Sequence, residues 1–163
     1  MQSAYLSDAF SFDPRTDQWK KLSDIVLGDS TPISIVGACA VTPGVNQVLV
    51  FGGDDGETAF ACEVLHRKIQ ELDNSGNRSE AAALRNKLTA TLDNHRGFSR
   101  KVLAYNVLTD SWTCVGEFPE PGPVTTTAVA WDGGVVIPTG EIRPGVRTPQ
   151  LWKIVSKRKL LHR

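Results

Sequence analysis

The fold of this chain is decided by the stretch VLAYNVLTDSW, residues 102–112, because the same pattern occurs earlier as AFSFDPRTDQW, residues 9–19. The two stretches align at a constant offset of 93, from 112 minus 19, and this offset places Tyr105 over Phe12. Each is an apolar strand, a polar turn and a second short strand with a tryptophan, which predicts a β-hairpin. A hairpin that recurs at a fixed offset indicates a chain built from repeated units.

Each hairpin is followed by the same elements: a polar loop with Gly and Pro, an apolar strand, a turn and a returning strand. The strands expected here are Ile33–Thr42, Gln47–Phe51, Val124–Trp131 and Gly134–Pro138. The returning strands end at Gly52-Gly53 in the first unit and at Thr139-Gly140 in the second. Four short strands per repeat predict a mainly β fold of propeller blades, and the Gly-Gly pair, the aromatic residue and the tryptophan resemble the Kelch motif.

The offset of 93 residues is far above the roughly 50 residues of a Kelch repeat, so the first unit carries an insertion. This insertion, residues 54–100, contains two segments in which apolar residues recur with helical spacing, 60–74 and 79–93. The sequence Asn-Ser-Gly-Asn at 74–77 separates them. We therefore expect a helical hairpin inserted into the blade.

The expected strands amount to roughly two and a quarter blades, whereas a closed ring needs about four or more. With strands lettered from the channel outward, residues 9–22 supply strands C and D, residues 33–53 and 101–115 one full blade, and residues 124–155 strands A, B and C of the next. The basic tail, residues 156–163, is expected to be a solvated end. Remaining blades, or other copies of the chain, are needed to close the ring.

The stretch GEIRPGVRTP, residues 140–149, holds Glu141, Arg143 and Arg147, and its prolines and glycines predict an irregular loop. In an up-and-down blade, every B-to-C and D-to-A connection emerges on one face. We therefore expect this loop, the helical insertion and the loops 23–32 and 116–123 around one mouth. A carboxylate there can act as a base, and an arginine can hold a carboxylate through two parallel hydrogen bonds.

The pattern of Gly140-Glu141, Pro144-Gly145 and Arg147-Thr148, one blade past a helical insertion, resembles the N-acetylneuraminate epimerase (sialic acid mutarotase) family and its cyclically permuted branch. The resemblance implies a six-bladed propeller that interconverts the α and β anomers of sialic acid without a cofactor. It further implies that Glu141 and Arg147 are the catalytic pair. Because a guanidinium can hold a carboxylate through two hydrogen bonds, Arg147, assisted by Arg143, is expected to bind the substrate. The acid that protonates the ring oxygen stays open between water and a residue on a missing blade. The chain departs from the family in its missing blades and in Thr139-Gly140, where the family has Gly-Gly.

Composition excludes several other classes of function. Lys+Arg and Asp+Glu both number 18, so we expect neither a nucleic acid nor a membrane as a partner. The start, Met1–Asp8, lacks the features of a signal peptide, although the resemblance leaves a periplasmic location open for a full-length protein. Cys39, Cys62 and Cys114 lack metal-site spacing and are expected to be reduced, with Cys39 and Cys114 buried.

Two alternatives compete with the epimerase interpretation. In a Kelch interaction scaffold, Glu141, Arg143 and Arg147 would form a surface ion-pair cluster. A copper radical oxidase would need Tyr, Cys and His ligands, but Tyr105 occupies a structural position of the repeat, so no metal site is expected. His66 and His95 lie in or beside the insertion and could contact a ligand at the mouth, but the expected state of both is exposure on a helix surface.

Overall fold

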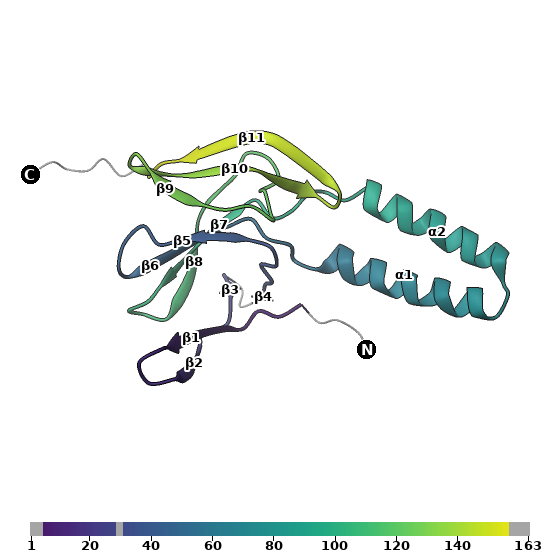
Figure 1. The fold of residues 1–163 in the computed structure, drawn as a ribbon, viewed down its shortest axis with the longest axis horizontal. Helices are drawn as coiled ribbons and strands as arrows, with labels where there is room; N and C mark the ends of the chain where they lie inside the picture. The colour runs from purple at the N-terminus through teal and green to yellow at the C-terminus, as the bar shows by residue number, and fades with distance from the viewer. Residues whose placement is uncertain (1–4, 29–30, 157–163) are drawn as a thin grey trace, which may run out of the picture.

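The computed structural model describes residues 5–28 and 31–156, and the basic tail beyond Ser156 lies outside the described residues. The described part is mainly β, with antiparallel sheets and one inserted pair of helices (Figure 1). In chain order the elements are β1 (Ala9–Asp13), β2 (Gln18–Leu22), β3 (Val26–Leu27), β4 (Thr31–Pro32), β5 (Cys39–Val41), β6 (Gln47–Phe51), α1 (Glu57–Asn74), α2 (Arg78–Asp93), β7 (Lys101–Asn106), β8 (Ser111–Glu117), β9 (Val129–Trp131), β10 (Gly134–Arg143) and β11 (Val146–Ile154).

The central sheet has the strand order β5-β6-β7-β8, and its strands are consecutive and antiparallel, as in a propeller blade. Strand β6 pairs with β7 although both helices separate them in sequence. The pairs Val50↔Leu103 and Phe51↔Val102 are adjacent in the register, so their side chains point to opposite faces of the sheet. Both faces of this sheet are apolar, and each packs against a different part of the chain.

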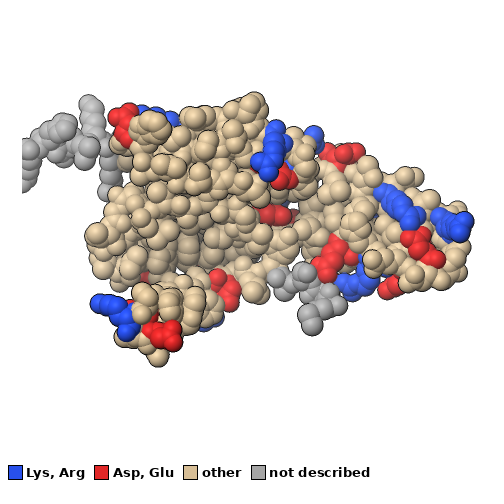
Figure 2. Space-filling view, viewed as in Figure 1, with Lys and Arg blue, Asp and Glu red and all other residues tan. Residues whose placement is uncertain are grey.

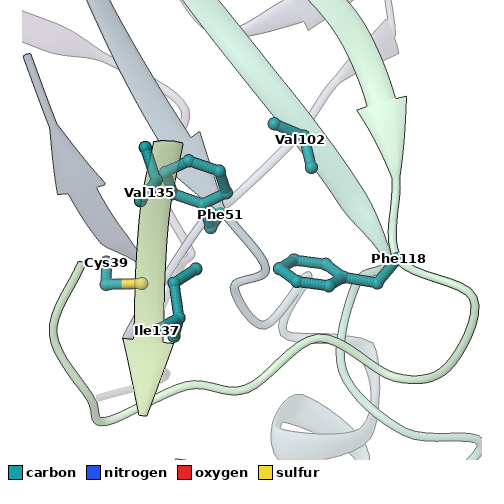
Figure 3. Packing of buried hydrophobic residues seen from close by; sticks show 6 residues of the cluster. All are labelled: Cys39, Phe51, Val102, Phe118, Val135 and Ile137. Carbon is teal, nitrogen blue, oxygen red and sulfur yellow. The ribbon is translucent and has the colours of Figure 1, made fainter. Parts of the chain in front are cut away.

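One face packs against the second sheet, which has the order β9-β10-β11. Phe51 and Ile137 have no exposed surface at the centre of this interface (Figure 3). Full burial of a side chain of this size contributes about 1.5–3 kcal/mol. The cluster consists of Cys39, Phe51, Val102, Phe118, Val135 and Ile137. This core fixes the second sheet, and with it Glu141 at the end of β10, against the first.

The opposite face packs against the segment that precedes β5. Ile25 is buried there with Val50 and Leu103. The segment starts at the end of the sheet away from the helices, because Asp110, in the turn between β7 and β8, accepts a hydrogen bond of 2.9 Å from the Ser23 backbone. The expectation that the whole loop 23–32 lies at the mouth is therefore wrong for its first part. The segment packs its apolar side chains along this sheet face. It reaches the end of the sheet nearest the helices only at Val36, whose carbonyl accepts a hydrogen bond from Asp54 N (2.9 Å).

The first strand of the blade is shorter than the expected run Ile33–Thr42. Only Cys39–Val41 forms β5, and Val36 makes an isolated bridge with Asp54. Gly37 lies between them with φ 71°, a left-handed conformation that interrupts the regular extended backbone at this point. The apolar composition was therefore a sign of burial rather than of one continuous strand.

The two hairpins that define the sequence repeat have matching geometry. Phe12 faces Trp19 across β1 and β2 with ring centroids 4.9 Å apart, and Tyr105 faces Trp112 across β7 and β8 at 5.0 Å. The first pair lies on a two-stranded sheet, and Trp19 is 69% exposed. In the second pair, Trp112 is half-buried because the rest of the blade covers it.

The helical hairpin is present as expected, and it projects away from the sheets (Figure 1). The Asn77 side chain caps α2, since its oxygen accepts from Glu80 N (3.4 Å) and its amide donates to the Glu80 carboxylate (2.8 Å). Cys62, Leu65 and Ile69 are the buried residues of α1. The Cys114 thiol, expected to be buried, is exposed because it lies on β8, the edge strand of its sheet.

Candidate functional site

The stretch 140–149 forms the end of a β-hairpin and not the irregular loop expected from its composition. Strand β10 continues to Arg143 and β11 begins at Val146, so only Pro144 and Gly145 lie outside the strands. Gly145 has φ 74°, which a tight turn requires and glycine adopts without strain. The Glu141 carboxylate closes the turn by accepting a 2.6 Å hydrogen bond from the Gly145 backbone N–H. The charged residues therefore stand on a strand ladder, which holds them more firmly than a loop would.

Glu141 is half-buried and is held on both sides by backbone pairing. Its N–H donates to Val124 O (3.0 Å) and its C=O accepts from Val124 N (2.8 Å). On the other side, Glu141 lies directly opposite Arg147 in the β10–β11 register. Directly opposed residues of an antiparallel pair project to the same face with Cβ atoms about 4.5–5.5 Å apart. One ligand can therefore contact both side chains.

The two arginines of the hairpin differ in what they contact. The exposed guanidinium of Arg147 makes no hydrogen bond or ion pair with any residue of the described ranges, Glu141 included. Arg143 Nη1 instead donates to the carbonyl of Asp93 (2.9 Å), the last residue of α2. Arg147 is thus free to hold an anion, whereas Arg143 ties the hairpin to the base of the helices.

The neighbouring blade repeats the geometry of Glu141. Asp54 follows Gly53 as Glu141 follows Gly140, and it bridges to Val36 as Glu141 bridges to Val124. Its carboxylate also accepts a hydrogen bond from the next glycine of the chain, Gly56 N (3.0 Å). Asp54 was missed from the sequence, although its place after the Gly-Gly pair matches that of Glu141 after Thr-Gly. Asp54 and Glu141 therefore occupy equivalent positions at the end of their blades that faces the helices, which is called the rim below.

Two threonines at this rim have a backbone conformation that threonine rarely adopts. Thr125 has φ 52° and Thr139 has φ 49°. Gly37 and Gly52 stand at the equivalent positions of the first blade, with φ 71° in both. The two blades thus share the same backbone conformation at these positions. The first blade adopts it with glycine, whereas the second adopts it with β-branched threonines, which are strained at positive φ.

The junction loop, residues 94–99, connects α2 to β7 and lies beside the rim. Phe98 N donates to Ile142 O (2.9 Å) and Ser99 N to Gly53 O (2.9 Å), so the loop is bound to both blades. His95 lies in this loop and is half-buried, which corrects the expectation of an exposed helix-surface histidine. The helix ends before it, and the ring packs edge-on against Phe98 with centroids 5.3 Å apart. His66, on α1, is exposed as expected.

Charged side chains of both signs gather where the sheets meet the helices, and fewer are seen on the sheet surface away from the helices (Figure 2). At this junction Arg96 pairs with Asp55 (3.0 Å) and Glu57 (3.5 Å). No trio of His, Cys, Asp or Glu within residues 5–28 and 31–156 is arranged to hold a metal ion. Neither described helix is long and apolar enough to cross a membrane. The described side chains near the mouth include the carboxylates of Asp54 and Glu141, the guanidinium groups of Arg96 and Arg147 and the imidazole of His95.

The fold and this rim define a class of protein: a set of Kelch-type propeller blades with a helical insertion and acidic and basic side chains at one mouth. The profile of the family described as N-acetylneuraminate epimerase matches residues 1–162, and the chain belongs to this family. The resemblance inferred from the sequence is thereby confirmed for the family and the fold.

Individual relatives agree with this assignment. The N-acetylneuraminate epimerase of Yersinia enterocolitica is 27% identical over 154 residues, which cover 91% of this chain and 35% of that protein. The protein of the same name from Brucella melitensis is 27% identical over 150 residues, covering 87% and 35%. A solved structure, titled "Structure of YjhT", superposes with a TM-score of 0.63 at 22% identity and covers 88% of this chain and 38% of that one. The chain thus spans about a third of the length of the curated relatives it matches.

Proposed function

We propose that this chain supplies the catalytic blades of a sialic acid mutarotase, which interconverts the α and β anomers of N-acetylneuraminate by ring opening and reclosure. The observation that carries the proposal is the cross-strand pair of Glu141 and Arg147, which face the same side of a rigid hairpin without forming an ion pair. Membership in the N-acetylneuraminate epimerase family supports the choice of substrate.

Glu141 is the base in this proposal. One carboxylate oxygen is occupied by the Gly145 N–H, which leaves the other to take the proton of the anomeric hydroxyl. As that proton leaves, the bond between the anomeric carbon and the ring oxygen breaks, and a ketone forms. The ring oxygen takes up one proton from water or from a group on a further blade. Rotation of the ketone and the reverse steps close the ring on its other face, so no atom is gained or lost.

Arg147 holds the substrate while the open chain rotates. Its planar guanidinium can donate two parallel hydrogen bonds to the carboxylate attached to the anomeric carbon, a geometry that lysine cannot offer. This contact would keep the reacting carbon near Glu141 throughout. Arg143 contributes by fixing the hairpin to Asp93, so its effect on binding would be indirect.

The test uses a chimera in which residues 5–156 replace the matching third of the Yersinia enterocolitica relative. Exchange between the two anomers is measured by saturation-transfer NMR. We expect Glu141→Gln to keep binding and to lower the acceleration of exchange by about 100-fold or more, because the amide cannot take the proton. Arg147→Lys should weaken binding roughly 10- to 100-fold, because the charge stays while the two-pronged contact is lost.

The matched control is Arg15→Lys, an exposed arginine on the β1–β2 turn, which should change neither binding nor exchange. The proposal fails if Glu141→Gln exchanges anomers as fast as the unmodified chimera. In that case a non-catalytic Kelch interaction scaffold becomes the better interpretation.

A further inference from the structure

A small, partly open cavity lies at the junction of helices and sheets, and Phe98 of its lining is hydrogen-bonded to Ile142 of the hairpin that carries Glu141. Its volume is about 10 Å³, close to the space that one water molecule or one hydroxyl group needs. The polar and charged side chains of its lining belong to Asp54, Asp55, Glu57, Thr58, His95, Arg96 and Ser99. The proposed reaction does not use this cavity.

The backbone determines which nitrogen of His95 carries a proton. The Gly97 N–H donates a 2.9 Å hydrogen bond to Nδ1 of the ring, so Nδ1 must be unprotonated and Nε2 carries the hydrogen. The Nε2–H has no hydrogen-bond partner among the residues that the structure describes. His95 therefore has its Nε2–H available as a donor at the wall of the cavity.

The loop that carries His95 has little freedom to move. Gly97 has φ 96°, and a side chain there would meet Pro121 at 2.4 Å, so the loop fits only with glycine at this position. The carbonyl of Ile142 accepts from Phe98 N (2.9 Å), one residue beyond Glu141 in the chain. The loop that carries His95 is thus hydrogen-bonded directly to the hairpin that carries Glu141 and Arg147.

The charges of the cavity select the kind of group it can bind. Asp55 and Glu57 share the single cation Arg96, and Asp54 adds a further carboxylate, of which one oxygen accepts from Gly56 N. This excess of negative charge disfavours an anion. A hydroxyl fits, because it can accept from His95 Nε2–H and donate to a carboxylate at once.

We propose that this cavity is a hydroxyl-binding subsite. In this proposal His95 Nε2–H donates to one hydroxyl of a sugar and Asp54 accepts from it. The identity of the sugar rests on the proposed function: its carboxylate lies at Arg147 while one of its hydroxyls occupies the cavity. In this proposal Nδ1 of His95 is held by Gly97 N and Nε2–H binds the hydroxyl, so His95 orients the substrate.

Three measurements on the full 163-residue chain test this. Nitrogen-15 NMR of the histidine rings should show His95 with bare Nδ1 and protonated Nε2. The affinities for N-acetylneuraminate and for its methyl ester, which lacks the negative charge, are then measured by titration. His95→Asn should bind both probes about 2- to 10-fold more weakly, the effect of one neutral hydrogen bond. His95→Gln, which places an amide donor near the position of Nε2, should recover most of the affinity.

His95→Asn also controls for structure, because the asparagine oxygen can accept from the N–H two residues on and keep the turn at Gly97. Both His95 variants lose the ring contact with Phe98, so the unfolding free energy of His95→Asn should match that of His95→Gln. A protonated Nδ1, unchanged affinity in His95→Asn, or no binding of either probe by the wild type would overturn the subsite. Failure of the proposed function looks different: Arg147→Lys would then bind the acid as well as the wild type does, while the His95 effect on the ester would remain.

Discussion

The strained residue Thr139 offers a quantitative test of how the second blade is built. It has φ 49° and an exposed side chain, and Gly52 takes its place in the first blade with φ 71°. A β-branched residue held in this region costs about 1–3 kcal/mol. Thr139→Gly removes that strain, while the greater freedom of glycine in the unfolded chain costs about 0.5–1 kcal/mol. We expect the substitution to stabilise the chain by about 1 kcal/mol, although it deletes a side chain.

The measurement is the free energy of unfolding from urea denaturation, with a thermal midpoint that should rise by about 2–4 °C. The control is Thr127→Gly, because Thr127 is also exposed but is absent from the positive-φ residues of the described chain. It should destabilise by about 0.5–1 kcal/mol, since only the entropic term applies. If Thr139→Gly destabilises the chain as much as Thr127→Gly does, the backbone strain assigned to this rim is wrong.

Two further predictions concern groups away from the hairpin. Burial and the 2.7 Å hydrogen bond from its hydroxyl to Asp110 raise the pKa of Tyr105 from 10.0 to about 12. The contribution of this group to stability is therefore complete below pH 10 and is lost as the pH rises from 10.0 to about 12. Tyr105→Phe should cost about 1 kcal/mol at neutral pH and reduce the loss of stability between pH 10 and 12 in denaturation curves; an unchanged alkaline profile would contradict this. Gly97→Ala should destabilise the chain by about 2 kcal/mol or more, because its methyl group would overlap Pro121, whereas Gly76→Ala, also at positive φ but with no atom within 4 Å, should cost only about 1 kcal/mol. Equal unfolding free energies for the two alanine variants would show that the Pro121 contact is unimportant.

The elements that depend on local pattern could be predicted from the sequence. The hairpins around Trp19 and Trp112 follow from an aromatic residue and a tryptophan placed on either side of a polar turn. The two helices follow from apolar residues at helical spacing, with Asn77 as the cap between them. The repeat identified the blades, because a fixed offset between matching segments survives where overall identity is low, and the motif at residues 140–149 indicated the family.

What the sequence by itself determined is therefore the set of local elements, their repetition and the charged residues that follow the strands. Only the tertiary structure decided which of these residues meet, because pairing between strands depends on partners distant in sequence and on a register that composition does not encode. Glu141 and Arg147 became cross-strand neighbours once β10 and β11 paired up to a two-residue turn. His95 became a half-buried, oriented group because the helix ended before it and the loop bonded to Ile142. Cys114 is exposed because β8 is an edge strand, a property of the assembled sheet and not of the residues around the cysteine.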